Sequence, residues 1–223
     1  MMIASLHNNY PVKKDQHVAG MRIIPLIIEK EKMEAVQKLV GKEPLFRLMP
    51  YQHKKVGIVT TGNEVYYGRI QDTFTPVVQA KIEAFGAEVV AHEYSSDDPE
   101  MEVACIEKVL AAGADMVLCT GGMSVDPDDK TPYAIGKTAD RVVSYGAPVL
   151  PGAMFMLAYK GAHDEIPMLG LPGCVMYAGR TTLPRVMAGD IVTKEDIDRL
   201  GVGGYCQHCP SCTFPNCGFG AYA

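Results

Sequence analysis

Three glycine-rich segments each follow an apolar stretch, and together they favour a site for an anionic ligand. They are TTGNE (60–64), TGGMSVDPDDKTP (120–132) and GLPG (170–173). Glycine lets the backbone approach a ligand closely, and exposed amides at the start of a helix attract phosphate. One such segment would indicate only a turn. None is a Walker A sequence, and no G-x-G-x-x-G follows the first strand, so ordinary nucleotide-binding motifs fit poorly.

Carboxylates gather beside these segments. They are Glu64, Asp72, Asp97, Asp98, Asp126, Asp128 and Asp129. Carboxylates normally repel an anion, so they fit such a site if Mg²⁺ or another hard cation bridges them to the ligand. A helix-capping role is the simpler interpretation of Asp72, Asp97 and Asp98, and Asp97 has capping-box spacing with Glu100. Ser124 has no histidine at a recognisable spacing, so acyl transfer is poorly supported.

Four cysteines crowd into the end of the chain. Cys206, Cys209, Cys212 and Cys217 have the spacing C-x₂-C-x₂-C-x₄-C. Four thiolates this close predict a metal, and the spacing is equally compatible with structural Zn²⁺ and with an Fe–S cluster. Unligated thiols are the alternative. The remaining cysteines lie in apolar or loop contexts typical of small buried side chains.

The first fifty or so residues predict little regular structure. Residues 18–28 indicate a strand interrupted by Pro25, which favours an edge or bent strand. Residues 30–40 predict a helix with Met33, Val36 and Val40 on one face, ended by Gly41.

From Lys55 onward, apolar strands alternate with helices. Strands are expected over 55–62, 87–94 and 114–122, with helices over about 75–86 and 97–112 between them. Further strands are expected over 141–145, 153–159 and 166–171, the last two forming a hairpin. A turn into a helix limited by Pro184 follows, and then a short helix opened by a capping box of Thr193 and Asp196.

This order predicts an α/β fold: a three-layer αβα sandwich with a mostly parallel, mixed sheet. We expect an N-terminal appendage and linker over 1–52, the α/β domain over 53–192, and a short helix with a cysteine-rich tail over 193–223. In open α/β sheets, ligands bind outside the carboxyl ends of the parallel strands, where the three glycine-rich segments would meet.

Composition excludes some classes of function. The net charge of −5 argues against a nucleic-acid binder, which would show a basic face. No apolar run reaches the roughly 18 residues needed to span a bilayer. The start of the chain lacks the order of a signal peptide, so we expect a cytoplasmic protein without a membrane partner.

Several motifs, in this order, resemble a known family. TTGNEV, GRIQD, DDPE, TGGMSVDPDDKTP and GLPGC resemble the molybdopterin-binding domain. That domain is shared by molybdopterin molybdenumtransferases (gephyrin-like insertases) and molybdopterin adenylyltransferases. APVLPGAMF, LPGCVMYA and the cysteine tail are similar to a narrower bacterial group of molybdopterin-binding proteins. The resemblance runs from about Pro11 to Gly220, and it implies that the N-terminal appendage is the remnant of a preceding domain.

The resemblance implies roles for individual residues. Asp129 resembles an acid used near the dithiolene and the incoming metal, and Glu64 resembles the acid of the family's T-G-D/S-E loop. Asp72 and Asp97 resemble further acidic positions of the insertase branch. Residues implied to hold the cofactor are Thr61, Gly62, Thr120, Gly121, Gly122, Ser124, Pro172 and Gly173.

The chain also departs from the family pattern. Asp126 stands where many insertases have glycine, and Cys174 follows LPG where they usually have asparagine. The stretch between Arg180 and Leu183 is shorter than expected, which would disturb the last helix.

Three functions remain open. The leading one is an enzyme that binds molybdopterin and inserts molybdate with the help of Mg²⁺. The second is a non-catalytic module, a carrier, sensor or maturation partner that holds the cofactor and whose tail docks a partner. A homo-oligomer or a molybdoenzyme maturation partner is expected as the protein partner. The third is adenylyl transfer from ATP to molybdopterin, which would use the same loop with Thr131 and Pro132.

Overall fold

The structure, a computed structural model, describes residues 2–6, 8, 10–149, 152–176 and 183–202. The four tail cysteines, Cys206 to Cys217, lie outside the described residues, so their predicted metal site stays a prediction. The chain divides into two units, Met1–Pro50 and Tyr51–Ala223, which are described separately.

The first unit contains a two-stranded antiparallel sheet and one helix. Strand β1 (Met2–Ser5) pairs with β2 (Ala19–Arg22), and α1 spans Lys30–Val40. The partly buried side chains of α1 are Met33, Val36 and Val40, and Gly41 follows with a φ of +72°, both as predicted. The predicted strand over 18–28 is shorter than expected and ends before Pro25. Large apolar side chains such as Leu26, Ile27 and Leu39 are exposed, and α1 has no fully buried residue.

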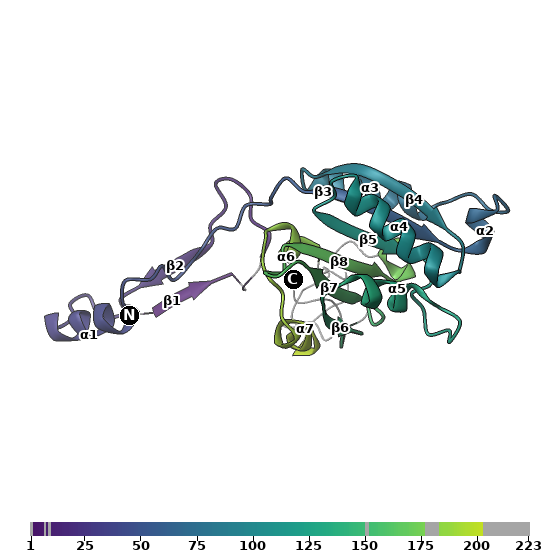
Figure 1. The fold of residues 1–223 in the computed structure, drawn as a ribbon. Coiled ribbons are helices and arrows are strands. Elements are labelled where there is room, and N and C mark those ends of the chain that lie inside the picture. Colours follow the sequence, from purple (N-terminus) through teal and green to yellow (C-terminus); the bar gives the residue numbers. More distant parts are fainter. Residues whose placement is uncertain (1, 7, 9, 150–151, 177–182, 203–223) are drawn as a thin grey trace. The chain divides into compact units, whose positions relative to one another are not determined.

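The second unit is built around a six-stranded sheet in the order β4-β3-β5-β8-β7-β6 (Figure 1). Strands β3, β4, β5 and β8 pair in parallel, whereas β7 pairs antiparallel with both β8 and β6, so the sheet is mixed as predicted. The strands are β3 (Lys55–Thr61), β4 (Glu88–Ser95), β5 (Met116–Thr120), β6 (Arg141–Tyr145), β7 (Met156–Lys160) and β8 (Ile166–Leu171).

Helices cover both faces of this sheet, which confirms the three-layer αβα sandwich. On one face, Val78 and Ile82 of α3 join a core that also contains Ile197 of α7. On the other face, Ile106 of α4 and Ile135 of α5 pack on the sheet. The helices are α2 (Asn63–Tyr66), α3 (Phe74–Ala84), α4 (Pro99–Ala111), α5 (Thr131–Thr138), α6 (Leu183–Met187) and α7 (Lys194–Arg199), with short 3₁₀ turns η1 (Gly173–Met176) and η2 (Leu200–Val202).

The order of the strands creates a switch point between β3 and β5. From its carboxyl end, β3 continues through α3 to β4 on one side, whereas β5 continues through α5 to β6 on the other side of the sheet. These two connections therefore diverge at the carboxyl ends of β3 and β5. This is where open α/β sheets leave a crevice for a ligand.

The structure tests several predictions about helix termini. The N-cap of α4 is Asp98, which accepts a hydrogen bond from the Met101 amide at 2.9 Å, so the capping interpretation is confirmed for Asp98 and the capping box at Asp97 was wrong. Pro184 stands in the first turn of α6, where a missing N–H costs nothing. The capping box of Thr193 and Asp196 is present. In the described part of the chain, no helix is long and apolar enough to cross a membrane.

The close contact between β3 and α4 gives a first prediction. A Cβ atom at Gly57 would lie 2.6 Å from Cβ of Val109 and 3.1 Å from Cβ of Ala114. We expect Gly57→Ala to lower the free energy of unfolding by about 2 kcal/mol, because α4 must shift away from the sheet. In the matched control, Gly136→Ala in α5, the nearest atom is 3.9 Å away, and a gain of about 0.5–1 kcal/mol is expected. Urea denaturation measures both. Equal stability of Gly57→Ala and the native chain would contradict the close contact.

Candidate functional site

The first two glycine-rich segments touch at the switch point. Thr60 of β3 pairs with Thr120 of β5, so the loops that follow these strands start side by side. A Cβ atom at Gly121 would lie 2.0 Å from the carbonyl oxygen of Thr61. Gly121 and Gly122 have φ values of +83° and +55°, which favour glycine. Only glycine therefore fits where the two loops meet.

The start of α5 holds the glycine loop in place. The Thr131 hydroxyl group donates a hydrogen bond to the carbonyl oxygen of Gly121 at 2.9 Å. A Cβ atom at Gly122 would lie 2.6 Å from the same hydroxyl oxygen. The loop thus brings its backbone directly against the N-terminus of a helix, where free amides attract anions.

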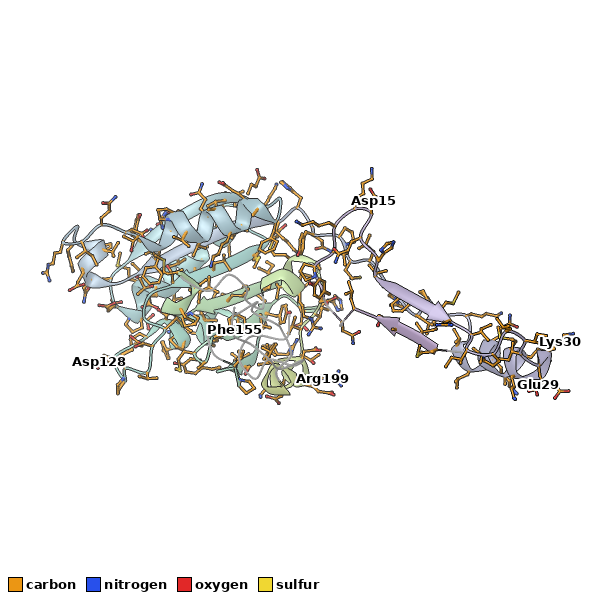
Figure 2. All side chains as sticks on the ribbon, turned by 180° about the vertical axis from the view of Figure 1, so that it is seen from behind. Asp15, Glu29, Lys30, Asp128, Phe155 and Arg199 are labelled. Carbon is orange, nitrogen blue, oxygen red and sulfur yellow. The ribbon has the colours of Figure 1, made fainter. Side chains whose placement is uncertain are left out.

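Asp129 stabilises the same loop through hydrogen bonds with Ser124. Its Oδ2 atom accepts hydrogen bonds from the backbone amide and the hydroxyl group of Ser124, at 2.5 and 2.7 Å. The Asp126 amide donates to the Ser124 hydroxyl, and the Asp128 amide donates to the Asp126 carboxylate. Asp128 stands at the exposed tip of the loop (Figure 2). Asp129 is partly buried, so it is the acid of this loop that faces inward.

The carboxylates do not form a ready-made metal centre. Within the residues that the structure describes, no group of three or more His, Cys, Asp or Glu side chains could hold a metal ion. Mg²⁺ often binds through one or two carboxylates and the phosphates of its substrate. Asp129 could therefore bind Mg²⁺ only if the phosphate of a ligand supplied further oxygen atoms to the ion.

Glu64 and Asp97 lie on the neighbouring loops. Glu64 is exposed in the first turn of α2, which lies at the same end of the sheet as the loop into α5 (Figure 1). The Asp97 carboxylate accepts a hydrogen bond from the Asn63 amide at 3.2 Å. The Gly62 amide donates to the carbonyl oxygen of Ser95 at 3.1 Å. These bonds join the loops after β3 and β4.

Asp72 has a structural role at the start of α3. Its Oδ1 atom accepts hydrogen bonds from the amides of Phe74 and Thr75 at 2.9 and 3.0 Å, and Tyr94 donates to Oδ2. Burial acts to raise the pKa of Asp72, but these hydrogen bonds outweigh it, so the pKa lies below its usual value. The capping interpretation describes this residue.

A network that the sequence did not reveal lies beneath Asp72. The hydroxyl group of Thr60 is 2.9 Å from the hydroxyl of Thr75 and 2.9 Å from Nε2 of His92. Thr120 donates to Thr60 at 3.4 Å. Burial lowers the pKa of His92, although the charge of Asp72 opposes this. The network links β3, β4, β5 and α3 on one face of the sheet.

The third glycine-rich segment follows β8 and lies at the same end of the sheet as the first two. Strand β8 pairs with β5, and Pro172 and Gly173 lead directly into η1. A Cβ atom at Gly173 would lie 3.9 Å from the Phe74 ring. Cys174 is partly buried, and the amino group of Lys81 donates to the carbonyl oxygen of Val175. The structure thus places all three predicted segments at one edge of the sheet.

Buried polar atoms without a hydrogen-bond partner lie near the carboxyl ends of the strands, on the face of the sheet that α4 and α5 cover. In the described part of the chain, the buried side-chain N and O atoms without a hydrogen-bond partner are Oγ1 of Thr61 and both carboxylate oxygens of Glu102. Buried polar groups almost always have a partner, and exceptions gather at functional sites. Thr61 ends β3, and Glu102 lies in the first turns of α4, on the face that α5 also covers.

Glu102 is a residue that the sequence analysis missed. Its side chain is 1% exposed. Burial raises its pKa to about 7; Asp97, Asp129 and Asp98 add to the rise, whereas the Thr131 hydroxyl opposes it. A signal was present, because Glu102 stands three, four and seven residues before the buried residues Cys105, Ile106 and Val109. That spacing places it on the apolar face of α4.

Comparisons with known proteins find a matching family model and several relatives. A family model described as a probable molybdopterin binding domain matches residues 57–188. A molybdopterin molybdenumtransferase from Synechococcus elongatus is 25% identical over 162 residues, which cover 69% of this chain and 38% of that protein. A CinA-like protein from Desulfosudis oleivorans is 37% identical over 84 residues, covering 38% of this chain and 20% of that protein. The chain therefore matches well under half the length of these relatives.

Solved structures share the fold. A molybdopterin biosynthesis protein from Mycobacterium abscessus superposes with a TM-score of 0.53 at 17% identity, covering 61% of this chain and 92% of that one. The molybdopterin biosynthesis enzyme MoaB from Thermus thermophilus gives a TM-score of 0.50 at 23% identity, covering 61% and 98%. At these identities the likeness shows the fold alone.

The buried carboxyl group makes stability depend on pH. Between its ordinary value of 4.5 and about 7, Glu102 keeps a proton in the folded chain and loses it on unfolding. Rising pH therefore favours unfolding over that range, by an amount on the order of 2–3 kcal/mol. We expect Glu102→Gln to remove this loss, whereas Glu107→Gln, exposed on the same helix, keeps it. Urea denaturation at pH 5, 6, 7 and 8 measures the difference, and parallel curves for Glu102→Gln and the native chain would contradict it.

Proposed function

The chain belongs to the molybdopterin-binding domain family, and on that premise we propose that it binds molybdopterin at the switch point and inserts molybdate into it. The observation that supports this most is the contact of the Gly121–Gly122 loop with the Thr61 carbonyl group. This contact leaves no room for a side chain at Gly121, and Thr131 leaves none at Gly122. The loop presents backbone amides to a phosphate instead.

The phosphate of the pterin is the part of the ligand that this loop would hold. Gly121, Gly122 and Ser124 supply the loop, and Thr131 fixes it against α5. The unpartnered hydroxyl group of Thr61 is a free donor next to it. Pro172 and Gly173 would border the ligand from β8.

Inserting a metal into a dithiolene needs little covalent chemistry from the protein. It needs molybdate and the dithiolene to be held together, which lowers the entropic part of the barrier. Asp129 is the acid best placed for this, because it is partly buried and fixed by two hydrogen bonds. Glu64 and Asp97 stand on adjoining loops, and Asp72 shapes the site by capping α3.

Mg²⁺ would bind between Asp129 and the ligand rather than in a protein cage. When bound, it would neutralise charge on the phosphate or on the oxyanion. The residues themselves orient the two anions and keep the loop closed around them. Molybdopterin and molybdate are the proposed partners, and the cytoplasm is the proposed compartment.

A binding module without catalysis is the second candidate. It is favoured by the bonds from Ser124, which already occupy one oxygen of Asp129, and by the partial coverage of the longer relatives. Such a module would carry the cofactor to a partner protein. Adenylyl transfer is the third candidate, and formation of adenylylated molybdopterin from ATP would reveal it.

The variant Asp129→Asn separates the candidates. Asparagine keeps an acceptor for Ser124 but loses the charge, so molybdopterin should bind within about threefold of the native affinity while molybdate insertion falls at least about a hundredfold. The control is Asp128→Asn, at the exposed loop tip. Affinity is measured by fluorescence titration and insertion by reconstitution of a molybdoenzyme. An Asp129→Asn chain that inserts molybdate as fast as the native chain would contradict the role of this acid. A native chain that binds molybdopterin but inserts no molybdate would leave the binding module.

The cysteine tail gives a separate prediction. We propose that Cys206, Cys209, Cys212 and Cys217 bind one Zn²⁺ ion or an Fe–S cluster. Anaerobic purification followed by metal analysis and an absorption spectrum tests this. Zinc without visible absorption, or iron with charge-transfer bands, identifies the metal, and Cys209→Ser should lower its content. A chain with neither metal contradicts the proposal.

A further inference from the structure

Glu102 carries a buried carboxyl group that no hydrogen bond or salt bridge stabilises in the described part of the chain. It is 1% exposed, and both of its oxygen atoms lack a hydrogen-bond partner in the described part of the chain. No basic side chain forms a salt bridge with it among the described residues. Lys108 and Lys137, the cations near α4, pair with Glu93 and Glu100 on exposed surface instead. A lone charge in such a place is costly, so the neutral form is favoured.

The groups that surround Glu102 add negative charge or none. Asp97 and Asp98 approach it from the loop before α4, and Asp129 from the loop before α5. Cys105 on its own helix and Cys119 on β5 also interact with it electrostatically. Burial keeps the thiol of Cys119 protonated by raising its pKa. Each of these neighbours therefore disfavours ionisation of Glu102 or leaves it unchanged.

Thr131 connects this carboxyl group to the glycine loop. Its hydroxyl group lies beside Glu102 but donates its single proton to the carbonyl oxygen of Gly121 at 2.9 Å. This arrangement suits a neutral Glu102. An ionised Glu102 would attract the Thr131 proton, because hydrogen bonds to a charged acceptor are the stronger ones. Gly121 would then lose the bond that fixes the loop.

We propose that Glu102 takes up one proton when an anionic group binds at the Gly121–Gly122 loop, so that the site accepts a phosphate only while this carboxyl group is neutral. This inference rests on the proposed function for the identity of the ligand. Its physical basis is that a phosphate next to an ionised, buried carboxylate would be repelled in a medium of low dielectric constant. Binding and protonation are then linked.

The pKa of Glu102 sets the number of protons that ligand binding should take up at each pH. With a pKa of about 7, Glu102 is about nine-tenths ionised at pH 8 and about one-tenth ionised at pH 6. Binding should therefore take up about 0.9 proton at pH 8 and about 0.1 at pH 6. The apparent affinity at pH 8 should be about tenfold weaker than that of a chain that does not need the proton.

Calorimetry tests the uptake directly. The full chain is titrated with molybdopterin, and separately with inorganic phosphate, in two phosphate-free buffers of different ionisation enthalpy at pH 6 and pH 8. Proton uptake follows from the difference in heat between the buffers. Glu102→Gln should bind about tenfold more tightly than the native chain at pH 8 and equally at pH 6, with the extra uptake gone. Glu107→Gln should behave as the native chain does, because it is exposed on the same helix.

A measurement without ligand keeps the two proposals distinguishable. The amide resonances of Gly121 and Gly122 should titrate near pH 7 in the native chain but not in Glu102→Gln. Titrating amides together with lost uptake in Glu102→Gln support the inference. Unmoved amides, or equal uptake by both chains, overturn it. If the amides titrate and phosphate binding takes up the proton but molybdopterin does not bind, the proposed ligand is wrong and the coupling stands.

Discussion

The approach of Gly121 to the carbonyl oxygen of Thr61 is the contact on which the site depends. It exists because β3 and β5 are neighbours in the sheet although α3, β4 and α4 separate them in the chain. The parallel register of Thr60 and Thr120 brings both strands to an end at the same level. Any side chain at Gly121 would push these ends apart. Because Thr131 and Asp129 both bind this loop, the start of α5 and the position of Asp129 depend on the same contact.

The polar side chains near that contact are hydrogen-bonded on one face of the sheet and unpartnered on the other. On the α3 face, Thr60, Thr75 and His92 satisfy one another, and Asp72 caps the helix above them. On the α4 face, Thr61 and Glu102 lack partners. A satisfied network stabilises the fold, whereas unpartnered groups cost stability and are kept where a ligand or a proton completes them. The α4 face is therefore the side on which we expect the proposed ligand.

The sequence predicted the layers better than the details of the site. Apolar strands such as 55–62 and helix signals such as Gly41 and Thr193 are local, and they matched the structure. Asp97 and Asp98 are adjacent carboxylates, and only the geometry of the chain decides which one caps α4. Glu102 was missed because an acid in a first helical turn normally complements the helix dipole in solvent. Its helical spacing to Cys105, Ile106 and Val109 was the one local signal, and its burial results from the packing of α4 on the sheet beside α5.

Carboxylates beside a phosphate site repel the ligand unless their negative charge is neutralised. Asp129 and Glu102 differ in how this can happen. Asp129, partly buried and accessible from the loop, suits an offset by a cation that arrives with the ligand. Glu102, fully buried behind Thr131, cannot share such a cation without exposing itself, so a proton is the offset open to it. A cation on one side and a proton on the other would together offset the negative charge of these carboxylates when a phosphate binds. The negative net charge of the chain is thus compatible with an anionic ligand.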